Sequence, residues 1–141
     1  MPLFGNKDHA AKDEANRAAL LEAERLMTLS PAELAAVLMP AFGPHGAVPS
    51  ARPLPGNPVS LRCVELAGWL FSGAPPPSGS PLAPRLEGAL REAVQVLEHA
   101  ELVYLSGQGE SISNQKWSAT RSGLSALAKG EAVVRQRIND R

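Results

Sequence analysis

One stretch near the C-terminus constrains the fold of this chain more than any other: LVYLSGQGESISNQKWSATRSGL, from Leu102 to Leu124. Its pattern predicts a single β-hairpin, with a first strand over 102–105, a flexible tip over 106–111 and a second strand over 112–119. Two strands alone are marginally stable in water and need another element to pack on. The rest of the chain therefore has to provide a supporting surface.

Helices are predicted on both sides of the hairpin. The helix over 84–100 has an apolar face at helical spacing and a polar face opposite. Its apolar positions are Leu86, Ala89, Leu90, Ala93, Val96, Leu97 and Ala100. After the hairpin, Thr120 is placed to cap a last helix, in which Gly130 lowers helical stability without necessarily ending the helix. The apolar side of this last helix carries Leu124, Leu127, Val134 and Ile138.

The N-terminal half begins with two more predicted helices. Residues 10–29 are rich in good helix formers. An apolar stripe runs along them through Ala19, Leu20, Ala23, Leu26 and Met27. Ser30 as N-cap, Pro31 at the first helical position and Glu33 in a capping box then predict a second helix that reaches about residue 39.

A further helix is predicted between two proline-rich segments. Five of the thirteen prolines fall within residues 43–58, which indicates a loop. Asn57 is placed as an N-cap with Pro58 at the first helical position, and apolar residues recur at helical spacing as far as Leu70. The stretch GAPPPSGSP, residues 73–81, interrupts the chain again before the helix over 84–100.

Composition narrows the class of protein. A chain of 141 residues suits one domain with one core. Fourteen basic residues balance fourteen acidic ones, so nucleic-acid binding would depend on a local basic patch. No segment indicates a signal peptide or a membrane span, so we expect a cytoplasmic protein with no membrane partner. The three histidines lack partners at metal-ligand spacing, and we expect neither a metal nor a cofactor.

Catalysis is not indicated. A Cys63–His99 nucleophile pair is conceivable, but Cys63 lies on an apolar helical stripe, which is typical of a buried, inert thiol. The glycine-rich tip at 107–109 suggests a phosphate-binding loop only superficially, because a strand and not a helix N-terminus follows it. We therefore do not expect an enzyme.

Two short phrases around the hairpin carry a resemblance. Residues 97–103, LEHAELV, end the helix before it, and residues 119–123, ATRSG, begin the helix after it. Roughly the last 60 residues resemble the winged helix-turn-helix domain of bacterial MarR-like and PadR-like transcriptional regulators, in which a hairpin wing packs on a recognition helix. Two departures are visible: Ala100 and Glu101 stand where glycine often supports a left-handed backbone, and the proline-rich stretch at 73–84 stands where a helix should precede the recognition helix.

The resemblance implies a mainly α fold with a small β-hairpin, a winged helix-turn-helix with extra N-terminal helices. It implies a small DNA-binding regulator that acts as a homodimer. Arg85, Arg91 and Gln95 would face the groove of double-stranded DNA, and Lys116 and Arg121 would hold phosphates. Residues 102–141 carry six basic residues against three acidic ones, which favours phosphate contacts at this end of the chain.

Three glutamates support an alternative function. Glu87, Glu92 and Glu98 share the predicted recognition helix and would repel phosphate. The alternative is a winged-helix protein–protein interaction module that does not bind DNA. Trp117 also has two interpretations, a side chain packed under the hairpin or an exposed one that stacks on a base.

The predicted organisation is one domain over residues 1–141. An N-terminal helical extension and a proline-rich loop occupy 10–56, and the winged-helix core occupies 57–141. The helix over 10–29 has two interpretations: its apolar stripe pairs with a second copy to build the dimer, or the helix folds back and caps its own core.

Overall fold

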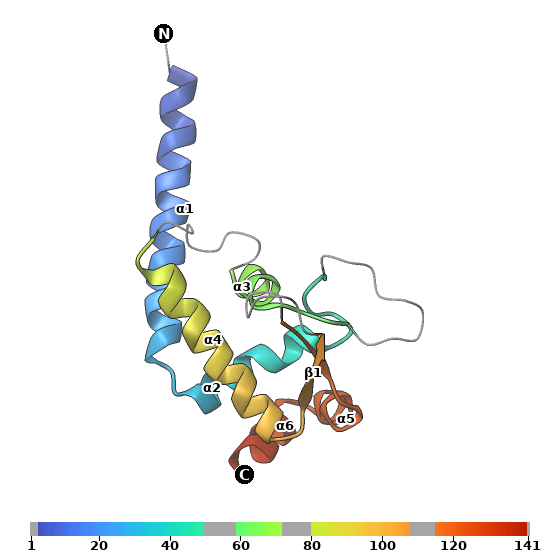
Figure 1. Ribbon diagram of the computed structural model, residues 1–141. Coiled ribbons are helices and arrows are strands. Elements are labelled where there is room, and N and C mark those ends of the chain that lie inside the picture. The colour runs from blue at the N-terminus through green and yellow to red at the C-terminus, as the bar shows by residue number, and fades with distance from the viewer. Residues whose placement is uncertain (1–2, 50–58, 72–79, 108–114, 141) are drawn as a thin grey trace.

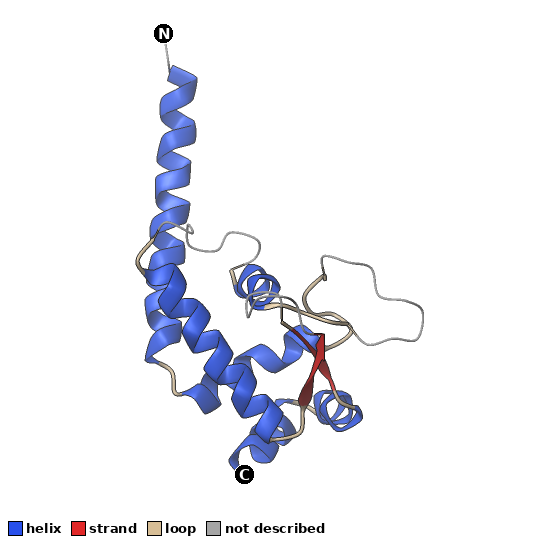
Figure 2. Cartoon of the chain, in the orientation of Figure 1, coloured by secondary structure: helices blue, strands red, loops and turns tan. Residues whose placement is uncertain are grey.

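A computed structural model describes residues 3–49, 59–71, 80–107 and 115–140, with the backbone alone for residues 3–12. The chain is mainly helical with one two-stranded antiparallel hairpin, which confirms the predicted class (Figure 1 and Figure 2). No helix among these residues is long and apolar enough to cross a membrane. The elements are α1 (Leu3–Thr28), α2 (Pro31–Leu38), a 3-10 helix η1 (Met39–Phe42), α3 (Cys63–Leu70), α4 (Leu82–His99), β1 (Val103–Gly107), β2 (Lys116–Ala119), α5 (Arg121–Lys129) and α6 (Glu131–Asn139).

The junction between α1 and α2 follows the predicted capping pattern. The Ser30 hydroxyl accepts a hydrogen bond from the Glu33 N–H at 3.2 Å, and Pro31 is the first helical residue. α1 begins at Leu3, earlier than the predicted start at residue 10. Its C-terminal half lies beside α4, whereas its N-terminal half extends away from the rest of the chain (Figure 1).

The start of α3 differs from the prediction. Asn57 and Pro58 lie outside the described residues, but residues 59–62 are not helical and α3 begins only at Cys63. Arg62 takes the cap position: its N–H and its Nε donate to the Glu65 carboxylate at 3.1 and 3.0 Å. The predicted apolar spacing is therefore helical only from Cys63 onward, because the residues before Arg62 pair with β2.

The N–H and C=O groups along the outer edge of β2 need hydrogen-bond partners, and the residues before α3 provide them. Leu61 and Trp117 exchange two backbone hydrogen bonds of 2.8 Å, which form an isolated antiparallel bridge between Leu61 and β2. Next to this bridge, the hydroxyl of the fully buried Ser118 is within hydrogen-bond distance of Ser60 at 3.0 Å and Ser106 at 2.9 Å. The serines satisfy the polar group that this face of the small sheet buries.

The hairpin has a defined register. Val103 pairs with Ala119 and Leu105 with Trp117, and the pairing shifts at a bulge between Leu105 and Gly107. The predicted tip and the first residues of the predicted second strand, 108–114, lie outside the described residues. Strand β1 also starts one residue later than predicted.

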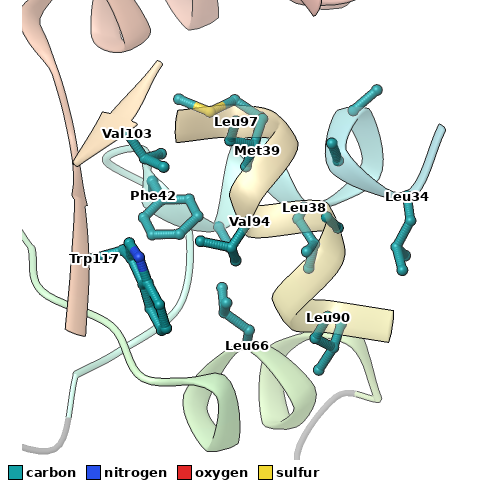
Figure 3. Close-up of a cluster of buried hydrophobic side chains, with 14 of the residues drawn as sticks. Leu34, Leu38, Met39, Phe42, Leu66, Leu90, Val94, Leu97, Val103 and Trp117 are labelled. Carbon is teal, nitrogen blue, oxygen red and sulfur yellow. The ribbon is translucent and has the colours of Figure 1, made fainter. Parts of the chain in front are cut away.

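The strands of the hairpin contact α4 and α5, and Trp117 also packs against η1 and α3. The Trp117 side chain is only 5% exposed and lies among Phe42, Val94 and Leu66 (Figure 3). Its indole Nε1 donates to the Glu98 carboxylate at 2.8 Å, which satisfies the one polar atom of the ring. This confirms that Trp117 is packed under the hairpin, and it explains how two strands are stable here.

The last helix is divided in two. Thr120 caps α5 as predicted, because its hydroxyl accepts from the Gly123 N–H at 2.9 Å. Gly130 has φ of 118° and ends α5, so it does more than weaken a continuous helix. Of the predicted apolar side, Leu124 on α5 is exposed, whereas Val134 and Ile138 on α6 are buried.

The C-terminal end of α4 has an unusual backbone residue. Glu101 has φ of 62°, the left-handed conformation that glycine normally supplies at this position. The Leu102 N–H donates to the Leu97 carbonyl at 2.9 Å, and the Glu101 N–H donates to the Glu98 carbonyl at 2.9 Å. These bonds close α4 and turn the chain into β1.

We expect Glu101→Gly to raise the free energy of unfolding by about 1 kcal/mol, because the left-handed backbone costs a residue with a Cβ atom roughly 1–2 kcal/mol. Glu101→Ala is the matched control, since it removes the same carboxylate and keeps Cβ. Urea unfolding of the two variants isolates the backbone effect. Equal stabilities of the Gly and Ala variants would contradict this prediction.

Candidate nucleic-acid interface

The exposed face of α4 holds two of the five predicted DNA-contacting residues. Arg85, Glu92, Gln95 and His99 are all exposed and recur at helical spacing along one side of the helix. The opposite side is buried against α1, α2 and α3. It carries Leu86, Leu90, Ala93, Val94 and Leu97. Arg85 and Gln95 therefore share a surface, as predicted, but Glu92 lies between them.

Arg91 lies one helical turn before Gln95 on α4 but is half-buried at the border of the exposed face. Its Nη2 atom contacts the Glu87 Oε1 atom at 2.6 Å, and its Nε atom is buried. The guanidinium is close to Cys63 at the start of α3: burial raises the pKa of the Cys63 thiol, and the charge of Arg91 offsets part of that rise. Arg91 therefore makes contacts within the chain, although its side chain is 32% exposed. The buried position of Cys63 agrees with its place on the predicted apolar stripe.

The C-terminal end of α4 borders an open depression of about 540 Å³, lined by Gln95, Glu98 and His99. Glu98 accepts the Trp117 hydrogen bond through Oε1. We did not find this pair in the sequence, because the two residues are 19 positions apart on different elements and no local pattern connects them.

Lys116 and Arg121 lie on separate elements beyond α4. Lys116 is half-buried in β2 and pairs with Gly107 across the bulge of the hairpin. Arg121 is exposed as the first residue of α5. Within the described part of the chain, no hydrogen bond or ion pair joins any two of the five predicted contact residues.

Carboxylates outnumber arginines on α3 and α4. The two helices carry Arg85 and Arg91 as their only basic residues besides His99. Their acidic residues are Glu65, Glu87, Glu92 and Glu98. Because a duplex presents closely spaced phosphate charges, this balance opposes docking of either helix against DNA. Net positive charge is found on α5 and α6, which carry Arg121, Lys129, Arg135 and Arg137 against Glu131.

Comparisons with known proteins do not place the chain in a family. No protein-family model, curated protein or solved structure matches it. In the described residues, no group of three or more histidine, cysteine, aspartate or glutamate side chains could hold a metal ion.

Proposed function

We propose that this chain is a cytoplasmic winged-helix protein that self-associates and binds a partner protein through the C-terminal part of α4. The order α2, α3, α4 and the β1–β2 hairpin, with a backbone bridge from Leu61 to β2, supports the winged-helix part of this proposal. The bridge between Leu61 and β2 adds one paired residue at the edge of the hairpin, and α3 is a helix that precedes α4 despite the proline-rich stretch between them. Both features strengthen the resemblance to MarR-like and PadR-like domains.

One observation carries the choice of partner. The arginine predicted to read bases, Arg91, has a buried Nε atom and contacts Glu87, and the exposed side of α4 presents Glu92 and Glu98. At the depression, Glu98 uses Oε1 for the Trp117 indole, so Oε2 is available to a partner. A lysine or arginine side chain of a partner protein would pair with this carboxylate and with the amide of Gln95. The proposed partner therefore presents a basic side chain.

The proposal can be tested with two capped peptides of equal length, one carrying two arginines and one carrying two glutamates. We expect the arginine peptide to shift the amide NMR signals of Gln95, Glu98 and His99 saturably, and the glutamate peptide to leave them unchanged. Glu98→Gln keeps the acceptor for Trp117 and removes the charge. It should weaken arginine-peptide binding by about tenfold, because a charge-assisted hydrogen bond is roughly twice as strong as a neutral one.

Glu131→Gln is the matched control, because it removes an exposed carboxylate from α6 and leaves α4 intact. It should not change the affinity for the arginine peptide. Equal shifts with both peptides, or unchanged affinity in the Glu98→Gln variant, would contradict binding of a basic side chain at this depression.

A DNA-binding homodimeric transcriptional regulator is the second candidate, and the exposure of Arg85, Gln95 and Arg121 favours it. The test is a salt titration of fluorescent duplexes against the native protein. If DNA is the partner, Lys116→Ala and Arg121→Ala should weaken binding to all sequences alike and lower the salt dependence by roughly one unit per contact. No saturable binding at low salt would remove this candidate.

Self-association requires a surface other than the predicted stripe. Ala19, Ala23 and Leu26 from that stripe are buried against the body of the same chain, so α1 caps its own core along this side. Any second copy has to bind elsewhere.

A further inference from the structure

A second face of α1 has the features of a self-complementary interface. Glu14, Ala18, Leu21 and Arg25 are all exposed and recur at i, i+4, i+7 and i+11, so they form one stripe along the helix. This outward stripe lies on the side of α1 away from the buried Ala19, Ala23 and Leu26. At its centre Leu21 is 67% exposed, which is high for a large apolar side chain.

The position of α1 leaves this stripe accessible. The helix has 26 residues, which corresponds to about 39 Å. Glu14 lies in its N-terminal half, which extends clear of the other elements (Figure 1), and Ala18, Leu21 and Arg25 in its C-terminal half are exposed. Most helices in proteins are stabilised by tertiary packing of an apolar face and not by helix propensity alone. A partner along the outward stripe would supply such packing.

The pattern of charge points to a second copy in antiparallel orientation. When two stripes run in opposite directions, Leu21 lies against the partner's Ala18 and Glu14 lies against the partner's Arg25. On the flank, Arg17 faces the partner's Glu24. Each contact occurs twice because the arrangement has two-fold symmetry. A parallel arrangement in register would instead bring Glu14 against the partner's Glu14, which is destabilising.

Because the side chain of Ala18 is small, the two helix axes can come close together at this point. Leu21 of the other copy is then buried against Ala18. Arg25 already contacts Glu22 within its own helix, with Nη2 to Oε1 at 2.6 Å. This exposed i,i+3 pair contributes little stability, so it does not prevent Arg25 from also reaching the partner's Glu14.

We infer that α1 forms an antiparallel homodimer through Glu14, Ala18, Leu21 and Arg25. The inference rests on the self-association in the proposed function and specifies its surface. It does not depend on whether α4 binds protein or DNA.

Charge reversal provides the test, with sedimentation equilibrium as the measurement. We expect the native protein to be a dimer at about 100 μM. Glu14→Arg and Arg25→Glu should each raise the dimer dissociation constant by roughly tenfold, because each places like charges together twice. The double variant restores both attractions and should return to within about threefold of the native constant. Leu21→Glu should raise the constant by about a hundredfold, since both copies lose an apolar contact.

Leu124→Glu is the matched control. Leu124 is an exposed leucine on α5, and its replacement should not change the dissociation constant. A monomeric native protein at the same concentration, or an unchanged constant in the Leu21→Glu variant, would overturn the inference. Failure of the double variant to recover would overturn the antiparallel arrangement. The arginine peptide separates the two proposals, because monomeric Leu21→Glu should bind it with native affinity.

Discussion

Gly123→Ala should lower the free energy of unfolding by about 3 kcal/mol or more. A Cβ atom at this position would lie 2.0 Å from the Leu102 carbonyl oxygen and 2.9 Å from the Met39 Cε atom. The methionine end can move, but the carbonyl cannot, because it belongs to the backbone and also accepts from the Thr120 N–H at 2.9 Å. The first turn of α5 would have to separate from the hairpin, and overpacking of this kind is among the costly single changes.

Gly88→Ala is the control for Gly123→Ala. Gly88 lies inside α4 and is exposed, and a Cβ atom there would meet nothing within 4 Å. We expect this change to stabilise the protein by roughly 0.5–1 kcal/mol, because alanine is the better helix former. Urea unfolding monitored by circular dichroism measures both effects. Similar stabilities for the two variants would show that the close contact at Gly123 is absent in solution.

Leu26→Glu should lower the free energy of unfolding by about 3 kcal/mol or more. Leu21→Glu, on the same helix, is the matched comparison. Leu26 is 1% exposed in the core beneath α1, so the new carboxyl group would have to be buried without a partner or displace α1. Leu21 is largely exposed, and its replacement should change the stability of the folded monomer by less than about 1 kcal/mol.

The measurement for this pair is urea unfolding at a concentration low enough to keep the protein monomeric. If Leu26→Glu gave a folded monomer of native stability, the stripe from Ala19 to Met27 would be a dimer interface, as one interpretation of the sequence predicted. The structure supports the other interpretation, in which this side of α1 caps the core of its own chain.

Local patterns predicted most of the elements correctly. Ser30 and Thr120 cap their helices as expected, because side-chain capping depends only on residues within one turn. The hairpin and the buried position of Trp117 were also predictable, since an isolated pair of strands requires a hydrophobic support and the tryptophan is its largest apolar side chain.

The remaining features depend on contacts between distant residues. α3 starts late because Leu61 pairs with Trp117, and no pattern within a few residues of Leu61 encodes that pairing. The pairing of Arg91 with Glu87 at i,i+4 was visible in the sequence, but the burial of its Nε atom beside α3 was not. The candidate site was therefore predicted only in part: Arg85 and Gln95 are exposed, whereas Arg91, one turn before Gln95, is half-buried and contacts Glu87.

The bridge between Leu61 and Trp117 also has a consequence for the order of folding. The two strands of the hairpin are neighbours in sequence, and a hairpin can form within microseconds. Leu61 is 56 positions from its partner, so its pairing must close a long loop before it contributes any hydrogen bonds. When α3 packs against α4, it brings Leu61 close to β2 and so reduces the entropy cost of closing that loop. We therefore expect the β1–β2 hairpin to form first and Leu61, which comes earlier in the sequence, to pair with β2 last.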